Sequence, residues 1–213
     1  MDRFARGHAQ DSFAEHALTP DENLADNTIS TSWARCSSFG LNPAGKPVDA
    51  VTSNTELSEI IQENQHIRKF VLPELELLYN QIAGTNFMVA YADTRGVVLD
   101  ALLDEEFKKS DAGKAVIPGS IWTENYRGTN ALGLALHSGA SQIVAGQDHF
   151  FRKLSNLSCF AAPIYGQDDQ IVGVIDATSD AASRQRHTLA LVKLASKNVE
   201  NRLFIDQFST SSI

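Results

Sequence analysis

The sequence predicts an α+β fold, in which helices pack across an antiparallel sheet of about six strands and long helices lie near both ends of the chain. Two observations support this prediction. Apolar residues recur at three- and four-residue steps in two long stretches, which is typical of amphipathic helices. Between these stretches, short apolar runs rich in β-forming residues come in pairs separated by turn-forming residues, which is typical of hairpins.

The composition allows one substantial folded unit and excludes several functions. The chain has 213 residues, of which 43% are hydrophobic, which suffices for one core. Its formal net charge of -8 provides no basic surface for a phosphate backbone, so direct nucleic-acid binding is not expected. No apolar run approaches the roughly 20 residues that cross a bilayer, so a cytoplasmic protein without a membrane partner is expected. The two cysteines, Cys36 and Cys159, are too few for a disulfide framework and are expected to be reduced.

The first part of the chain is polar. Residues 1–28 show no sustained apolar period and are expected to form a mobile leader. A short amphipathic helix is predicted from Ile29 to Phe39, and the two prolines and two glycines that follow predict a loop. Residues 29–54 are therefore assigned to a short helix and a loop, residues 55–208 to the folded domain, and residues 209–213 to a tail or linker.

A long helix with one buried stripe is predicted to begin at Thr55, which is a plausible N-cap. The apolar positions from Leu57 to Ile82 recur mostly at helical spacing. Pro73 lies inside this pattern, where it removes a backbone donor and clashes with the preceding turn. A kink or a break into two helices is therefore expected near Leu72.

Two hairpins are predicted in the middle of the chain. The first consists of residues 87–91 and 96–102, and the second of residues 157–165 and 170–176. Both hairpins are apolar on both faces, which predicts a sheet covered by helices on one face and by loops or a cavity on the other. Pro163 cannot donate to a ladder, so its strand is expected to lie at an edge or to be bulged there.

The segment between the hairpins is expected to be mostly irregular and helical. Gly128-Thr129-Asn130 precedes a helix of small residues, Ala131 to His137, which Gly139 closes. Residues 141–145 are predicted to form a further strand, and residues 149–152 a short helical turn.

The last helix, predicted over residues 183–208, carries two apolar seams. One stripe is formed by apolar residues at helical spacing: Leu189, Val192, Ala195, Val199 and Leu203. Leu191 and Leu194 lie beside it. Two seams exceed what contact with one sheet needs, so pairing with a second helix is expected, and a homodimer through the terminal helices is predicted.

Four motifs, in order along the chain, resemble those of one family. They are Thr31–Cys36 with Gly40-Leu41, Ile117–Glu124 with Gly128–Gly133, Asp148–Phe150, and Cys159–Ile164. Over residues 30–205 the chain resembles the GAF-type sensor domains of acetoin-catabolism regulators, which are sigma-54-dependent bacterial transcriptional activators. The resemblance implies a GAF-like sheet and a non-catalytic domain that binds a small metabolite, acetoin-like or another small polar compound. Occupancy would be transmitted through the terminal helices.

Members of this family usually continue into an ATPase module and a helix-turn-helix. The spacing from Gly128 to Gly133 is followed by Leu134, so no lysine is placed to meet a phosphate and no phosphate-binding loop is predicted. We expect the chain to be an excised sensor fragment. The alternative is a natural short protein that acts through a partner.

The resemblance places the ligand pocket between the sheet and the segment around Trp122. The expected ligand-binding residues are Trp122, Glu124, Gly128, Thr129, Asn130, His149, Phe150, Cys159 and Ala161. Structural roles are the alternative for several of them. Gly128 permits an unusual backbone angle, Thr129 or Asn130 caps the next helix, Trp122 anchors the core, and Glu124 satisfies backbone amides.

The alternatives to a metabolite sensor are a small GAF-type redox enzyme and a sensor of a protein partner. The spacing of His149 and Cys159 fits no zinc pattern, and a Cys–His dyad needs an orienting third group, so no metal, cofactor or catalytic activity is expected. Cys159 is interpreted as a small buried hydrophobe. A sensor of a protein partner remains open, and a pocket filled by Phe150, Phe151 and Phe160 would favour it.

Overall fold

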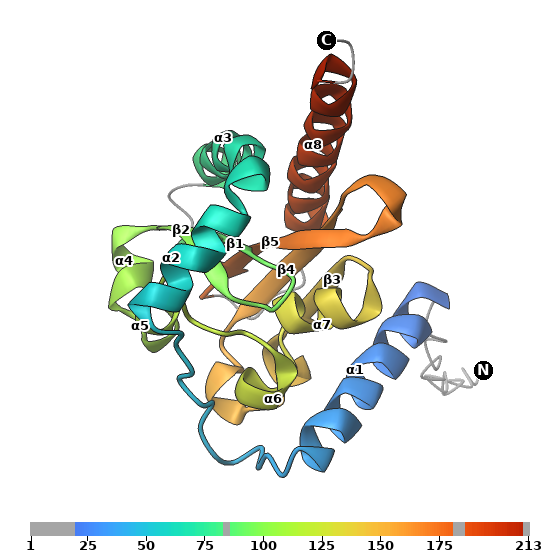
Figure 1. Cartoon of the computed structure of the whole chain (residues 1–213). Coiled ribbons are helices and arrows are strands. Elements are labelled where there is room, and N and C mark those ends of the chain that lie inside the picture. Colours follow the sequence, from blue (N-terminus) through green and yellow to red (C-terminus); the bar gives the residue numbers. More distant parts are fainter. Residues whose placement is uncertain (1–19, 83–85, 181–185, 211–213) are drawn as a thin grey trace, which may run out of the picture.

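The computed structural model describes residues 20–82, 86–180 and 186–210. Figure 1 shows a central sheet with helices on both of its faces. The elements follow in the order α1 (Pro20–Ser38), α2 (Asn54–Glu63), α3 (Gln65–Ile82), β1 (Phe87–Ala92), β2 (Val98–Leu103), α4 (Glu105–Lys109), α5 (Asp111–Ala115), α6 (Glu124–Arg127), α7 (Ala131–Ser138), β3 (Gln142–Ala145), β4 (Ser158–Tyr165), β5 (Ile171–Ser179) and α8 (Arg186–Thr210).

The sheet is antiparallel and has the strand order β2-β1-β5-β4-β3. Both predicted hairpins and the short strand after α7 are confirmed. The described residues form five strands, where about six were expected. The segment at Ser120 and Ile121 adds isolated bridges to Val51 and Val97 rather than a strand of its own.

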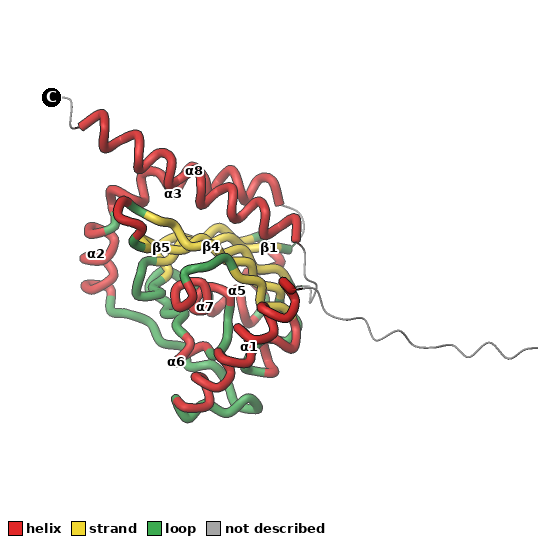
Figure 2. The backbone as a smooth tube through the Cα atoms, turned by 90° about the vertical axis from the view of Figure 1, so that its right-hand side faces the viewer, coloured by secondary structure: helices red, strands yellow, loops and turns green. Residues whose placement is uncertain are grey.

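Two separate cores lie on the two faces of the sheet, because successive side chains of a strand point to opposite faces. Figure 2 shows α3 and α8 on one face and α7 on the other. The face toward α3 and α8 carries Phe87, Val89 and Tyr91 of β1 and Phe160, Ala162 and Ile164 of β4. The face toward α7 carries Met88, Ala90 and Ala92 of β1 and Cys159 and Ala161 of β4. The prediction of a sheet that is covered on both faces is confirmed.

The long helix expected from Thr55 is divided, but at Asn64 rather than at Pro73. Asn64 leaves the helical conformation, and its backbone and side-chain N–H groups both donate to the carbonyl of Ile60. Pro73 lies inside α3 on its exposed face, where water can satisfy the carbonyl that the proline leaves unpaired. The N-cap is Ser53, whose hydroxyl accepts from the N–H of Glu56, so the assignment to Thr55 is wrong.

Pro163 occupies a locally open edge of β4, as predicted. β3 pairs with β4 only as far as Ala161. The carbonyl of Pro163 accepts a hydrogen bond from the Ser196 hydroxyl of α8 at 2.5 Å, so it points away from the ladder with β5. The missing N–H of Pro163 therefore removes no ladder bond.

The two end helices differ from the prediction in length and partner. α1 begins at Pro20 rather than at Ile29, so part of the expected leader is helical, and residues 1–19 lie outside the described ranges. The predicted buried stripe of α8 packs on the sheet, and its second neighbour is α3 of the same chain. Within the described residues, no helix is long and apolar enough to cross a membrane.

Candidate functional site

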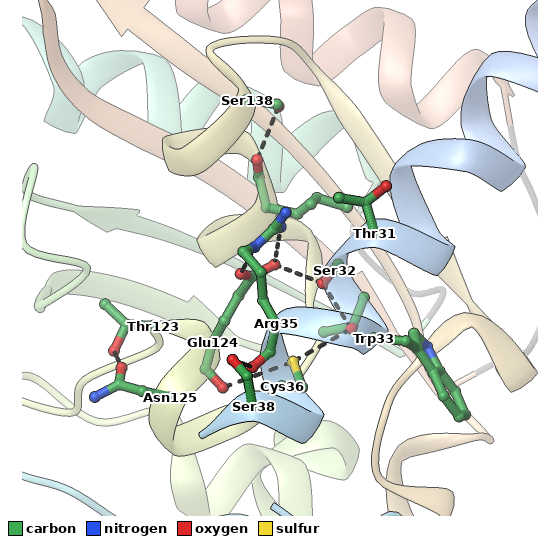
Figure 3. Close-up of polar contacts among 12 residues, drawn as sticks. Thr31, Ser32, Trp33, Arg35, Cys36, Ser38, Thr123, Glu124, Asn125 and Ser138 are labelled. Carbon is green, nitrogen blue, oxygen red and sulfur yellow. Dashed lines mark hydrogen bonds and ion pairs between the residues drawn. The ribbon is translucent and has the colours of Figure 1, made fainter. Parts of the chain in front are cut away.

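An ion pair joins α1 to α6 (Figure 3). Arg35 donates from Nε to Glu124 Oε2 at 2.7 Å and from Nη2 to Glu124 Oε1 at 2.8 Å. The Ser32 hydroxyl donates to Glu124 Oε1 at 2.5 Å, and its oxygen accepts from the Thr129 hydroxyl at 2.7 Å. Glu124, Ser32 and Thr129 are buried, so this network is largely shielded from water. Glu124 therefore binds α1 rather than the start of its own helix.

The neighbouring residues of α1 contact a second segment. The Trp33 indole N–H donates to the carbonyl of Asp148 at 2.8 Å, and its ring meets the ring of Phe150 edge-on at 5.2 Å. The Cys36 thiol is fully buried beside the Thr129 hydroxyl. Residues from three of the four family-like motifs thus meet in one place, because α1 docks on the segments that hold the other two.

The Gly128–Asn130 segment sets up the start of α7. Gly128 has φ +65°. The Asn130 side chain caps α7 by accepting from the N–H of Gly133 at 2.9 Å. Its amide group donates to the carbonyls of Gly128 and Trp122. The predicted cap and the predicted closing Gly139, which is left-handed, are both confirmed.

Replacing Gly128 by alanine is expected to lower the free energy of unfolding by about 2 kcal/mol. The new Cβ would lie 2.8 Å from the Cβ of Phe150, in a backbone conformation that L residues rarely adopt. Gly40 is the matched control, because it has φ +79° but open space around it, and its replacement isolates the backbone strain. Urea denaturation compares the two variants. Equal losses would show that the packing against Phe150 contributes nothing.

A small enclosed cavity of about 10 Å³ lies between the sheet and the first turn of α7. Its lining includes the apolar residues Met88, Val98, Trp122 and Leu132 and the polar residues Asn130, Cys159, Asp176 and Thr178. The Trp122 indole N–H donates to the Ser120 hydroxyl at 3.0 Å, which confirms that this indole finds an acceptor within the core. A space of this size holds about one water molecule.

Asp176 is the one acidic side chain among the residues that line this cavity. Its side chain lies on the α7 face of β5, opposite Ala90 and Ala161, and the residue is 3% exposed. Oδ2 accepts from the Thr178 hydroxyl at 2.9 Å, whereas the buried Oδ1 has no hydrogen-bond partner among the described residues. Burial raises the pKa of Asp176 to about 7, and the Thr178 hydrogen bond opposes the shift.

His149 and Cys159 are in contact, although their spacing gave no sign of it. His149 Nε2 lies 3.3 Å from the Cys159 sulfur, and Nδ1 lies 3.2 Å from the carbonyl of Gly146. Burial lowers the pKa of His149 to about 4 and raises the pKa of the Cys159 thiol. The imidazole is therefore neutral with its proton on Nδ1, and the thiol donates to Nε2. A neutral buried thiol is a weak nucleophile.

The structure brings three of the nine expected ligand residues to the cavity, namely Trp122, Asn130 and Cys159. The other six have different surroundings: Glu124 and Thr129 bind α1, Gly128 and Phe150 pack together, His149 contacts Cys159, and Ala161 lies in the core beneath α7. Sequence analysis missed Asp176 and Thr178. The signal was an acidic residue at the end of a strand that is apolar on both faces.

The described residues offer no group of three or more histidine, cysteine, aspartate or glutamate side chains that could hold a metal ion. His149 and Cys159 form a pair to which the described part of the chain adds no third such ligand.

A family model described as the MimR N-terminal domain matches residues 8–201 of the chain. The chain belongs to this family. Other relatives of this MimR-type domain include the acetoin dehydrogenase operon transcriptional activator AcoR of Bacillus subtilis, which is 31% identical over 185 residues. The propane 2-monooxygenase operon transcriptional activator MimR of Mycolicibacterium smegmatis is 29% identical over 189 residues. These matches cover 86% and 88% of the chain, and they confirm the resemblance to acetoin-type regulators.

The MimR-type domain also matches a solved structure, the E. coli DhaR(N)–DhaL complex, with a TM-score of 0.82. The match covers 87% of this chain and 63% of the other, at 20% identity, and it confirms the predicted GAF-like α+β fold. The chain spans about 30% of the length of the two curated activators, at 30% and 31%.

Proposed function

We propose that this domain is the signal-sensing part of a cytoplasmic bacterial transcriptional activator, and that it binds a small hydroxyl-bearing metabolite between the sheet and α7. The observation that carries the proposal is the buried Oδ1 of Asp176, a residue that lines the cavity, because this oxygen has no hydrogen-bond partner among the described residues. A buried carboxylate oxygen without a donor is costly, so a ligand that supplies a donor there gains affinity.

The neighbouring groups define what the ligand must offer. The Thr178 hydroxyl already donates to Asp176 Oδ2, and the Asn130 amide already donates to two carbonyls. The remaining walls, such as Met88, Val98 and Leu132, are apolar. The site therefore suits a compact molecule with one hydroxyl group on a short hydrocarbon body. Acetoin, which the names of two relatives mention, belongs to this chemical class.

Binding must enlarge the cavity, because a space of about 10 Å³ holds one water molecule and no metabolite. The movable wall is the start of α7 with Trp122, since β1 and β5 belong to the continuous sheet. The start of α7 is linked through Thr129 to Ser32 of α1. Ligand entry would thus shift the packing of α1, which is a route for the signal to leave the domain.

The test is calorimetric titration with acetoin and butane-2,3-diol, with butanone as the matched probe that lacks a hydroxyl group. Both hydroxyl compounds are expected to bind and butanone is not. The Asp176→Asn variant is expected to lose affinity, whereas Asp169→Asn, at an exposed position in the β4–β5 turn, is not. Equal binding of butanone, or no binding of any probe, would contradict the ligand proposal and favour a protein partner as the signal.

The affinity of a hydroxyl ligand is also expected to rise with pH. The ionised form of Asp176 is the stronger acceptor for the ligand hydroxyl, and with a pKa of about 7 its ionised fraction rises about tenfold between pH 6 and pH 8. Titrations at these two pH values measure the change. A fall in affinity would mean that the protonated carboxyl group donates to a carbonyl ligand instead.

The domain is further proposed to be non-catalytic and to leave DNA binding to other parts of the activator. The names of the relatives describe regulators, the His149–Cys159 pair is buried and neutral, and the net charge is -8.

The homodimer also stays a proposal. Leu72, Leu77 and Leu194 expose 38%, 49% and 54% of their surface on α3 and α8, which lie side by side in Figure 2. Sedimentation showing a monomer at roughly tens of micromolar would contradict it.

A further inference from the structure

A second buried ionic group, Arg127, lies against Trp122, whose indole also lines the cavity of Asp176. The residue ends α6 and is 3% exposed. Its guanidinium carbon lies 4.6 Å above the centre of the Trp122 ring, and Nη1 donates to Asp49 Oδ1 at 2.7 Å. The Asp49 side chain is 78% exposed, so water weakens this ion pair.

The other edge of the Arg127 guanidinium has no acceptor. Nε and Nη2 are both buried and make no hydrogen bond to any described residue. The same edge of Arg35 holds both carboxylate oxygens of Glu124, and the same edge of Arg68 holds both oxygens of Asp100, at 2.6 to 2.8 Å. The protein thus pairs this edge with a carboxylate at two other places.

A surface cavity of about 560 Å³ is formed beside Arg127 by the loop before α2, by α5 and by residues 153–157. This volume lies within the range of about 300–1,000 Å³ that is typical of small-molecule sites. Lys46, Lys114 and Lys153 also line it, against two acidic side chains, Asp49 and Asp111. Lys46 and Lys153 make no ion pair with a described residue, so the cavity carries an excess of positive charge in a chain that is acidic overall.

We propose that this cavity binds a small organic carboxylate, whose two oxygens accept from Nε and Nη2 of Arg127 once a side chain of the cavity wall moves off this edge, because both nitrogen atoms are buried. Two parallel N–H groups match the geometry of a carboxylate better than that of a single-point acceptor. The lysines at the cavity attract the anion, and Val51, Ile117 and Leu157 provide apolar walls for its hydrocarbon body. Burial lowers the pKa of Arg127 and Asp49 opposes this shift, so a second anion would further stabilise the charge.

This site is separate from the proposed hydroxyl site but shares Trp122 with it, since the indole lines both cavities. The two ligands differ in charge, so each site can be tested without the other. A carboxylate would not enter the cavity of Asp176, because a second negative charge next to that side chain is unfavourable.

The experiment is calorimetric titration of the domain with sodium butyrate, sodium succinate and sodium benzoate at constant ionic strength. Butyramide is the neutral control of the same shape as butyrate, and sodium sulfate and sodium phosphate are the inorganic controls. At least one carboxylate is expected to bind, and the intrinsic fluorescence is expected to change because Trp122, one of the two tryptophans, stacks on Arg127. Arg127→Lys keeps the positive charge but removes the two parallel N–H groups of Nε and Nη2. This variant is expected to weaken carboxylate binding about tenfold or more.

Two further variants complete the design. The double change Lys46→Ala with Lys153→Ala affects exposed residues only, and is expected to weaken binding even if Arg127→Lys fails to fold. Arg152→Ala, a neighbouring exposed cation that does not line the cavity, is expected to bind normally. Asp176→Asn is also expected to bind carboxylates normally, which separates this site from the hydroxyl site.

The proposal is overturned if no carboxylate binds, if butyramide binds as well as butyrate, or if sulfate or phosphate binds more tightly than every carboxylate. It is equally overturned if carboxylate binding is unchanged in both Arg127→Lys and the double lysine variant.

Discussion

The Glu124→Gln variant is expected to lose about 3 kcal/mol of its free energy of unfolding, because it leaves the Arg35 guanidinium without its carboxylate. Glu124 is buried, and the Arg35 side chain is 23% exposed, so the loss lies at the lower end of the range for a buried pair. Glutamine keeps the size of the side chain and one acceptor for the Ser32 hydroxyl. The loss of stability therefore results from removing the negative charge of Glu124 and not from creating a cavity.

Urea denaturation measures this loss, and Glu106→Gln is the matched control. Glu106 pairs with Lys109 on the surface, so its replacement is expected to leave stability unchanged. Adding Arg35→Met to Glu124→Gln should recover part of the loss, since no unpaired charge then remains. A Glu124→Gln variant as stable as the wild type would show that α1 is held by Trp33 and Cys36 alone.

The fold could be predicted from the sequence mainly where the signals are local. The turn at Asp93 needs a side chain that accepts from the N–H groups of Arg95 and Val97, and aspartate supplies it. The caps of α7, Asn130 and Gly139, are likewise set by side-chain and backbone chemistry within a few residues. Such signals do not depend on what the rest of the chain does.

The break in the first long helix could not be located in this way. The sequence contains a proline at position 73, which is a stronger local signal than an asparagine at position 64. The outcome depends on tertiary structure, since Asn64 Oδ1 also accepts from the buried Tyr91 hydroxyl at 3.3 Å. Pro73 is exposed, so its cost to α3 is small.

The candidate site was only partly predictable for a related reason. Family-like motifs show which residues matter but not which of them face a ligand. Glu124 and Thr129 matter because they hold Arg35 and Ser32, which lie far away in the sequence. Asp176 belongs to no motif that was singled out, and its importance follows from the absence of a partner for Oδ1, which only coordinates reveal.

The Asp176→Asn variant is expected to be more stable than the wild type above pH 7 and to show a flatter dependence of stability on pH. The folded pKa of Asp176 is about 7 against an ordinary value of 3.8, so the folded state binds the proton more tightly than the unfolded state. Its contribution to stability is therefore largest below pH 4 and falls as pH rises toward 7. Between pH 5 and pH 8 the predicted loss is about 3 kcal/mol in the wild type.

The comparison of the two proteins isolates this effect, because His149 titrates in the opposite sense. Its pKa is lowered to about 4, so its contribution is present above its ordinary value of 6.5 and is lost as pH falls. Urea denaturation of the wild type and the variant at pH 5 and pH 8 gives the difference between their free energies of unfolding. The contribution of His149 is the same in both proteins and cancels in this difference. If the difference does not change with pH, Asp176 is ionised throughout and its Oδ1 has a donor, so the cavity would no longer call for a hydroxyl ligand. If the variant gains stability at pH 8 while losing affinity for acetoin, the same carboxylate destabilises the ligand-free domain and binds the signal, which is the trade-off between stability and function expected of a recognition site.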